Sequence, residues 1–111
     1  MKDDRVYLVH ISEAIRRVED NTKAGKDTFF ASHTLQDAVI RNLQTMTEAT
    51  QRLSESLKAA HPEIPWQRLA AFRNVLVHNY LGIDLEAVWQ VVTRDVPVLK
   101  AAVRAMLDAL P

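Results

Sequence analysis

The sequence has no cysteine among its 111 residues. This absence excludes both a disulfide framework and a metal site built on thiolates. The four histidines, at positions 10, 33, 61 and 78, are too scattered to form a local pair of metal ligands. A histidine–carboxylate site assembled by the tertiary structure stays open, but no spacing indicates one. We therefore expect neither a metal nor a cofactor.

Glycine and proline are scarce, with two and four residues respectively. A β-sandwich needs many tight turns, so this scarcity favours helices. No apolar run approaches the roughly 20 residues that cross a bilayer, and the N-terminus lacks the layout of a signal peptide. The chain length suits one domain. We expect a single cytoplasmic domain over residues 1–111, without membrane contact.

Neither sign of charge is in excess, because fourteen basic residues balance fourteen acidic ones. A net charge of zero argues against a broad, nonspecific binder of nucleic acid. It leaves room for a local arginine patch on a neutral protein. The hydrophobic fraction of 48% and the charged fraction of 25% are those of an ordinary globular protein.

Two long segments have the apolar spacing of amphipathic helices. The first runs from Asp4 to Lys23, with Gly25 expected as a left-handed cap and Asp27 as the cap of a short turn. The second begins at Ser32 or Thr34, where Thr34 to Asp37 fits a capping box, and continues to about Ala60. Its seam alternates spacings of four and three, as in a bundle: Val39, Leu43, Met46, Thr50, Leu53 and Leu57. Thr50, the polar member, should bond back to its own helix.

The second half of the chain predicts further helices. His61-Pro62 ends the long helix, because a residue before proline avoids the helical region. Pro65 suits the first position of the next helix, which stops by Gly82. Asp84 should cap another, and Pro97 predicts a kink or a restart capped by Asp95 before a last helix over 98–110. The fold class is therefore all-α, an antiparallel bundle of four to five helices.

One segment, from Arg73 to Tyr80, concentrates side chains suited to phosphate chemistry. Arginine offers a planar fork for phosphate oxygens, and the pKa of histidine, ~6.5, lies near working pH. Arg5 and His10 repeat the same spacing, so spacing alone does not identify a site, and that first pair is expected on a solvated helix face. On one ideal helix Arg73 and His78 point about 140° apart. Either the helix opens before His78, a second subunit completes the site, or the two cations merely cap the helix.

The longer phrases are more specific. Asn74 and Tyr80 accompany Arg73 and His78, and three flanking stretches surround them: Gln36 to Leu43, Pro62 to Trp66, and Leu81 to Leu85. Together these phrases resemble the HepT-like branch of the HEPN superfamily over nearly the whole chain. The resemblance implies a HEPN-like helical homodimer whose Arg/His motifs lie near the dimer interface. It also implies an MntA-like nucleotidyltransferase as antitoxin partner, which adenylylates Tyr80.

The function implied by this resemblance is a metal-independent endoribonuclease, the toxin of a toxin–antitoxin module. His78 would act as general base or general acid on RNA, Arg73 would stabilise the charge on the phosphorane, and Asn74 would orient His78 or the phosphate. The alternative is a non-catalytic helical partner, or substrate-binding subunit, of a minimal nucleotidyltransferase. A third possibility is a helical dimer that binds nucleotides or RNA ends without cutting them.

Overall fold

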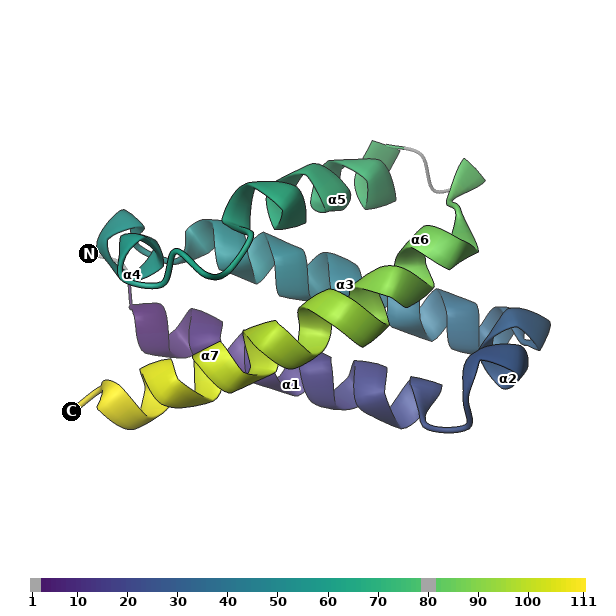
Figure 1. Ribbon diagram of the computed structural model, residues 1–111, viewed down its shortest axis with the longest axis horizontal. Helices are drawn as coiled ribbons and strands as arrows, with labels where there is room; N and C mark the ends of the chain where they lie inside the picture. The colour runs from purple at the N-terminus through teal and green to yellow at the C-terminus, as the bar shows by residue number, and fades with distance from the viewer. Residues whose placement is uncertain (1–2, 79–81) are drawn as a thin grey trace.

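The computed structural model describes residues 3–78 and 82–111, and every regular element in those ranges is a helix. Two long helices, α1 (Asp4–Thr22) and α3 (His33–Arg52), lie side by side and antiparallel, joined by the short α2 (Lys26–Ala31) (Figure 1). The all-α prediction is confirmed. None of the helices in the described ranges is long and apolar enough to cross a membrane.

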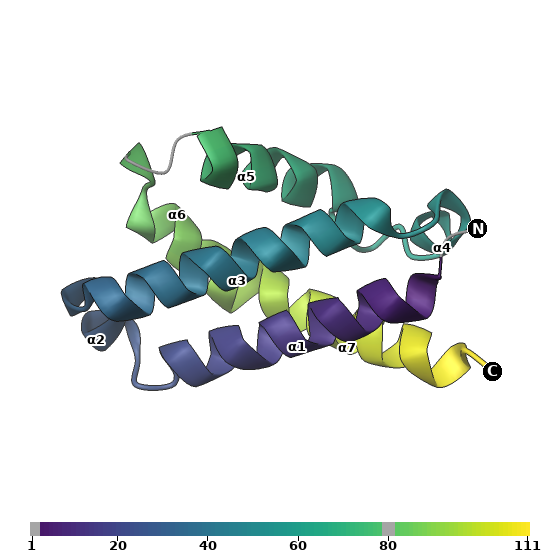
Figure 2. The ribbon, with the colours of Figure 1, turned by 180° about the vertical axis from the view of Figure 1, so that it is seen from behind.

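The core follows the predicted apolar stripes. Along α1 and α3 the stripe residues are fully or almost fully buried: Leu8, Ile11, Ile15, Val18, Val39, Leu43 and Met46. The C-terminal helix α7 (Val96–Ala109) packs against α1, and in the view from behind α1 lies in front of it (Figure 2). Buried residues of α1, α3 and α7 belong to one contiguous apolar cluster, so the spacing of three and four identified the core faces correctly.

The corner between α1 and α3 departs from the sequence prediction. Gly25 does have a positive φ, but its φ of 100° and ψ of 175° place it in an extended region accessible to glycine, not in a left-handed helical cap. It precedes α2, and Asp27 makes no capping bond there. Phe29 is buried, whereas Phe30 is 36% exposed. Gln36 secures this corner, since its Nε2 donates to the carbonyls of Phe29 and Phe30 at 3.1 Å each.

The start of α3 was predicted at one of two residues, and Ser32 is the correct one. Its Oγ accepts a hydrogen bond of 3.1 Å from the amide of Leu35, which satisfies a donor at the helix start. Thr34 instead lies inside the first turn, so the capping box from Thr34 to Asp37 is wrong. Thr50 does bond back to its own helix, donating to the carbonyl of Thr47 at 2.7 Å.

The largest correction concerns the end of α3. The helix stops at Arg52 instead of continuing to Ala60, and a separate helix, α4 (Glu55–Ala59), follows. Ser54 caps α4, and its amide and hydroxyl donate to the two carboxylate oxygens of Asp4 at 2.8 and 2.7 Å. Asp4 and Ser54 are 50 residues apart in the sequence. The apolar spacing within α3 therefore could not reveal that the helix ends at Arg52, where this contact fixes the start of α4.

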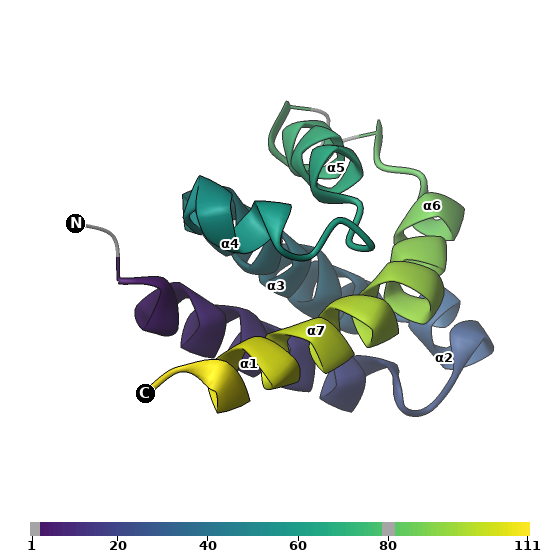
Figure 3. The same ribbon diagram turned by 60° about the vertical axis from the view of Figure 1, so that its left-hand side comes forward.

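The C-terminal half begins with α5 (Trp66–His78), which packs chiefly on α3 (Figure 3). Helix α6 (Leu85–Gln90) is capped by Asp84 as predicted, with its carboxylate accepting from the amide of Glu86 at 2.9 Å. A π-helical segment, η2 (Val91–Asp95), then leads into α7, which has Pro97 in its first turn. The chain stays helical from α6 into α7, so the predicted restart is absent, and the irregularity before Pro97 is the π-helical segment. Asp95 makes no capping bond, and its carboxylate pairs with Arg68 of α5.

Candidate active site

Helix α5 carries the residues that the sequence analysis selected. Pro65 directly precedes it, and the carbonyl of Pro65 accepts the first helical bond from Leu69. The indole Nε1 of Trp66 donates to the carbonyls of Lys58 and His61 at 3.0 Å each, which fixes the start of the helix to the end of α4. Buried Leu69 and Leu76 face the core. This packing holds Arg73 in the middle of a firmly placed helix.

Arg73 is half-buried, with 29% of its side chain exposed. Its Nη1 donates to Oδ1 of Asn74 at 3.2 Å, and its Nη2 lies 3.6 Å from the Glu48 carboxylate on α3. Its Nε is buried and has no hydrogen-bond acceptor among the described residues. An unsatisfied buried donor on a cation is costly. The guanidinium is held by loose contacts through Nη1 and Nη2, and the N–H groups of these two atoms that the contacts leave over can bind an anion.

Arg73 opens into a hollow of about 380 Å³ between α1, α3 and α5. Five residues line it: Tyr7, Glu48, Gln51, Arg52 and Arg73. Two guanidinium groups against one carboxylate give the hollow a net positive charge, and Tyr7 adds a phenol that can donate a hydrogen bond. An oxyanion such as a phosphodiester suits this combination of donors and charge.

Four of these lining residues were missed by the sequence analysis: Tyr7, Glu48, Gln51 and Arg52. Tyr7 precedes Ile11 by one helical turn, so the apolar period of α1 already placed it beside the core, where it is half-buried. Glu48 and Arg52 lack any such signal, because charged residues on an amphipathic helix usually face solvent. They reach Arg73 only through the packing of α3 against α5.

His78 is the last residue of α5 and is exposed. The helix continues without interruption from Arg73 to His78, so it does not open before the histidine. The two side chains therefore point about 140° apart within one protomer. Within one protomer the two side chains do not converge on one phosphate, and a site completed by a second subunit stays a prediction.

Asn74 is exposed and shares the His78 face of α5, since four residues separate them. Its side chain, however, contacts Arg73, because Oδ1 of Asn74 accepts a hydrogen bond from Nη1 of Arg73. Among residues 3–78 and 82–111, Arg73 contacts the side chains of Asn74 and Glu48 and no carbonyl at the end of α5, so Arg73 does not cap this helix there, whereas His78 lies in its last turn. Tyr80, the predicted modification site, lies outside the described residues.

The pair Arg5 and His10 repeats the motif spacing without forming a comparable site. Arg5 donates to the carbonyl of Pro111 at 2.6 Å, and His10 is exposed beside Arg17 and Arg41 in a separate shallow groove. Among the described residues, no group of three or more histidine and acidic side chains is placed to hold a metal ion.

The family model described as "Ribonuclease HepT-like" matches residues 11–106. The chain belongs to the HepT-like ribonuclease family. The match covers α3, α5 and both Arg73 and His78, so the motif and the helix that carries it lie within the region that the family shares. It also confirms the family resemblance drawn from the phrases around Arg73.

Similar proteins come from archaea and from bacteria. A Methanocaldococcus jannaschii protein, whose name gives it gamma-glutamylcyclotransferase and, provisionally, RNase activity, is 39% identical over 98% of this chain and 50% of its own length. A "Probable ribonuclease HepT" of Thermococcus cleftensis is 39% identical over 85% of this chain and 86% of its own. The chain thus spans half the length of the first relative. No solved structure matches.

Proposed function

We propose that this HepT-like chain is a metal-independent endoribonuclease. The observation that carries the proposal is Arg73, which is half-buried and lines a positively charged hollow, on the helix that also presents His78. A scissile phosphodiester bound there would receive donors that strengthen as charge develops on its oxygens. Membership of a ribonuclease family supports RNA as the substrate.

The reaction uses the 2′-hydroxyl of RNA as internal nucleophile. As this oxygen bonds to phosphorus, His78 takes its proton, or alternatively gives a proton to the 5′-oxygen as that P–O bond breaks. Arg73 stabilises the intervening phosphorane, and Asn74 holds the Arg73 guanidinium. The products are a 2′,3′-cyclic phosphate and a free 5′-hydroxyl. DNA lacks the nucleophile, so it is not cut.

The divergence of Arg73 and His78 on α5 supports a homodimer in which one cleft combines Arg73 of one copy with His78 of the other. Mixing two inactive variants tests this arrangement. When Arg73→Ala and His78→Ala chains are unfolded together and refolded, half of the dimers are mixed, and each mixed dimer has one intact cleft of two. About a quarter of the wild-type activity should return. Homodimers of either variant alone should stay inactive.

The central test is cleavage of RNA by the purified protein in the presence of a metal chelator, with His78→Ala prepared in parallel. His78 is exposed at the end of α5, so its truncation should leave the fold intact. Cutting that persists with chelator, leaves cyclic phosphate ends and disappears in the variant is the expected result. Equal cleavage of a strand with 2′-deoxyribose at the cut site would contradict the mechanism.

We further propose that the protein acts in the cytoplasm as the toxin of a toxin–antitoxin module, neutralised by an MntA-like nucleotidyltransferase that adenylylates Tyr80. Tyr80 follows His78 by two residues, so added phosphates would bring negative charge close to the cleft and repel RNA. Incubation with the partner and ATP should raise the mass of the chain by whole AMP units, and Tyr80→Phe should abolish that increase.

The same geometry gives the second candidate its specific support. If the chain stays a monomer, Arg73 and His78 face different directions and cannot share a phosphate, which favours a non-catalytic partner or substrate-binding subunit of a nucleotidyltransferase. Light scattering of the purified, unmodified protein separates the two. A folded monomer without nuclease activity would support the second candidate.

A further inference from the structure

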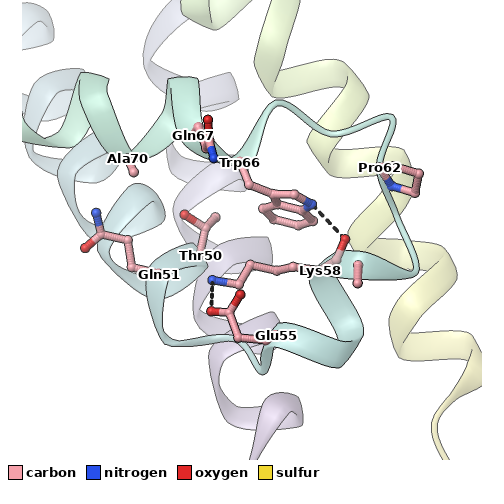
Figure 4. A pocket seen from close by; sticks show the side chains of 9 residues that line it. Thr50, Gln51, Glu55, Lys58, Pro62, Trp66, Gln67 and Ala70 are labelled. Carbon is pink, nitrogen blue, oxygen red and sulfur yellow. Dashed lines mark hydrogen bonds and ion pairs between the residues drawn. The ribbon is translucent and has the colours of Figure 1, made fainter.

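A second hollow is separate from that of Arg73 and lies at the junction of α3, α4 and α5. Its volume is about 520 Å³, within the range of small-molecule sites. Figure 4 shows its lining, with the Trp66 indole between the start of α5 and the Lys58–Glu55 pair. Gln51 of α3 lines this cavity and also the hollow around Arg73, so the two are adjacent. We call the larger one the Trp66 cavity.

Trp66 is a preorganised aromatic surface. Its Nε1 donates to two carbonyls, from Lys58 and His61, and these bonds fix the plane of the ring. The ring nevertheless lines the cavity, so part of it faces open space. A fixed aromatic ring facing a cavity suits a flat, apolar-faced ligand, and base stacking on tryptophan is a common source of affinity for single-stranded nucleic acid.

The polar groups around the ring suit the edge of a nucleobase. Gln51 and Gln67 are exposed carboxamides, each with donors and an acceptor, and neither makes a side-chain hydrogen bond to another described residue. Lys58 pairs with Glu55 at 3.2 Å, but the Glu55 side chain is 89% exposed, so this pair is weak and easily exchanged.

The spacing along α5 connects this cavity to the proposed cleavage site. Trp66 and Arg73 are seven residues apart, which places them within about 20° on one face and about 10 Å apart along the axis. Ala70, whose side chain is small, lies about one turn from each of them and lines the cavity. One nucleotide spans such a distance from its phosphate to the far edge of its base.

From this arrangement we propose that the Trp66 cavity binds a nucleobase next to the phosphate held at Arg73. The base stacks on the Trp66 indole, and Gln51 and Gln67 bond to its polar edge. This proposal rests on the proposed ribonuclease function for the position of the phosphate. It adds a substrate subsite that selects single-stranded RNA, because a base paired in a duplex cannot enter the cavity.

Tryptophan fluorescence tests the cavity directly. In a Trp89→Phe background Trp66 is the one remaining tryptophan of the sequence. The probes are a dinucleotide phosphate with 2′-deoxyribose, which is not cleaved, and two versions of it that lack the base on the 5′ or the 3′ side. The intact probe should quench Trp66 emission to saturation. Removing the base that occupies the cavity should weaken binding by about fivefold to a hundredfold.

Variants place the base within the cavity. Gln67→Ala should weaken binding of the intact probe by about two- to tenfold, and Gln90→Ala, an exposed glutamine on α6, should leave it unchanged. Trp66→Leu should abolish base-dependent binding, measured with a fluorescent probe. Because that substitution also removes the two bonds to α4, the Gln67→Ala result decides the matter if the Trp66 variant unfolds.

RNA cleavage is assayed on the same preparations, so the two proposals fail separately. Equal quenching by the intact probe and both probes lacking a base, with RNA still cut, would overturn the subsite and leave the ribonuclease standing. Base-dependent quenching without any cleavage would leave the nucleobase site standing and remove the ribonuclease. Absence of quenching by every probe overturns the subsite irrespective of cleavage.

Discussion

The contact between Asp4 and Ser54 predicts a large loss of stability from one substitution near the N-terminus. Asp4 is half-buried, and its carboxylate accepts two hydrogen bonds, at 2.8 and 2.7 Å, from the amide and hydroxyl of Ser54. Asp4→Ala removes both acceptors. Hydrogen bonds to charged groups contribute about 1.5–3 kcal/mol each when well formed, and partial exposure reduces that value, so we expect a total loss of about 2 kcal/mol.

This loss corresponds to a measurable shift in melting temperature. The unfolding entropy of a domain is about 2.1 cal/mol/K per residue, so for this chain 2 kcal/mol should lower the Tm by about 9 °C. Thermal unfolding followed by circular dichroism measures it. Asp37→Ala is the matched control, because Asp37 is an exposed acid of α3 without a hydrogen bond or ion pair to the other described residues. Its Tm should stay equal or rise slightly, since alanine favours helix.

A double-mutant cycle refines the prediction. Ser54→Ala removes the hydroxyl that bonds to Asp4 and also caps α4, while the backbone bond to Asp4 remains. The two substitutions should therefore be non-additive by more than about 0.5 kcal/mol, as expected of residues in contact. Two results would refute this reasoning: a Tm of Asp4→Ala within about 2 °C of the Asp37→Ala control, or additive effects of Asp4→Ala and Ser54→Ala. Either result would mean that the Asp4–Ser54 contact does not stabilise the junction between α3 and α4.

Three further predictions concern other parts of the frame. Ser32→Ala removes the cap of α3 and should lower the free energy of unfolding in urea by about 1 kcal/mol, whereas Thr34→Ala should leave it unchanged. Equal losses for the two variants would support the capping box from Thr34 to Asp37 instead. Gln36→Leu should cost about 2 kcal/mol in the same assay, because it removes two bonds to the end of α2, and an unchanged midpoint would refute this. A hydrogen bond from Arg16 lowers the pKa of the Glu13 carboxyl. Its contribution is therefore present above the ordinary carboxyl pKa and lost as the pH falls through the lowered one. The Tm difference between wild type and Glu13→Gln should accordingly be small at neutral pH and vanish in acid, and a difference that grows in acid would contradict it.

The parts of the fold that sequence predicts are those set by local chemistry. The buried stripe of α1 and the Ser32 and Asp84 caps each follow from neighbouring residues. Two of the errors occur where a distant group changes the local outcome. Asp95 loses its capping role because Arg68, on another helix, takes its carboxylate. Ser54 ends a helix that its own neighbours would continue, because Asp4 binds it.

The candidate site shows the same division. Arg73 and His78 were selected from their chemistry and from the surrounding phrases, and the continuous helix fixes their divergence. Glu48, Arg52 and Gln51 could not be selected, because a charged or amide side chain on a helix surface carries no local mark of which hollow it lines. Packing of α3 against α5 supplies that information.

The break after Arg52 connects the stability of the frame to the proposed recognition of RNA. If α3 continued to Ala60, as its apolar spacing suggests, the chain could not turn at Leu53 to place Lys58 beneath the Trp66 indole. The cavity therefore depends on the Asp4–Ser54 contact, although neither residue lines it. Asp4→Ala should then alter Trp66 emission well below the melting temperature. It should also weaken the base-dependent binding while leaving Arg73 and its Glu48 contact on α3 in place.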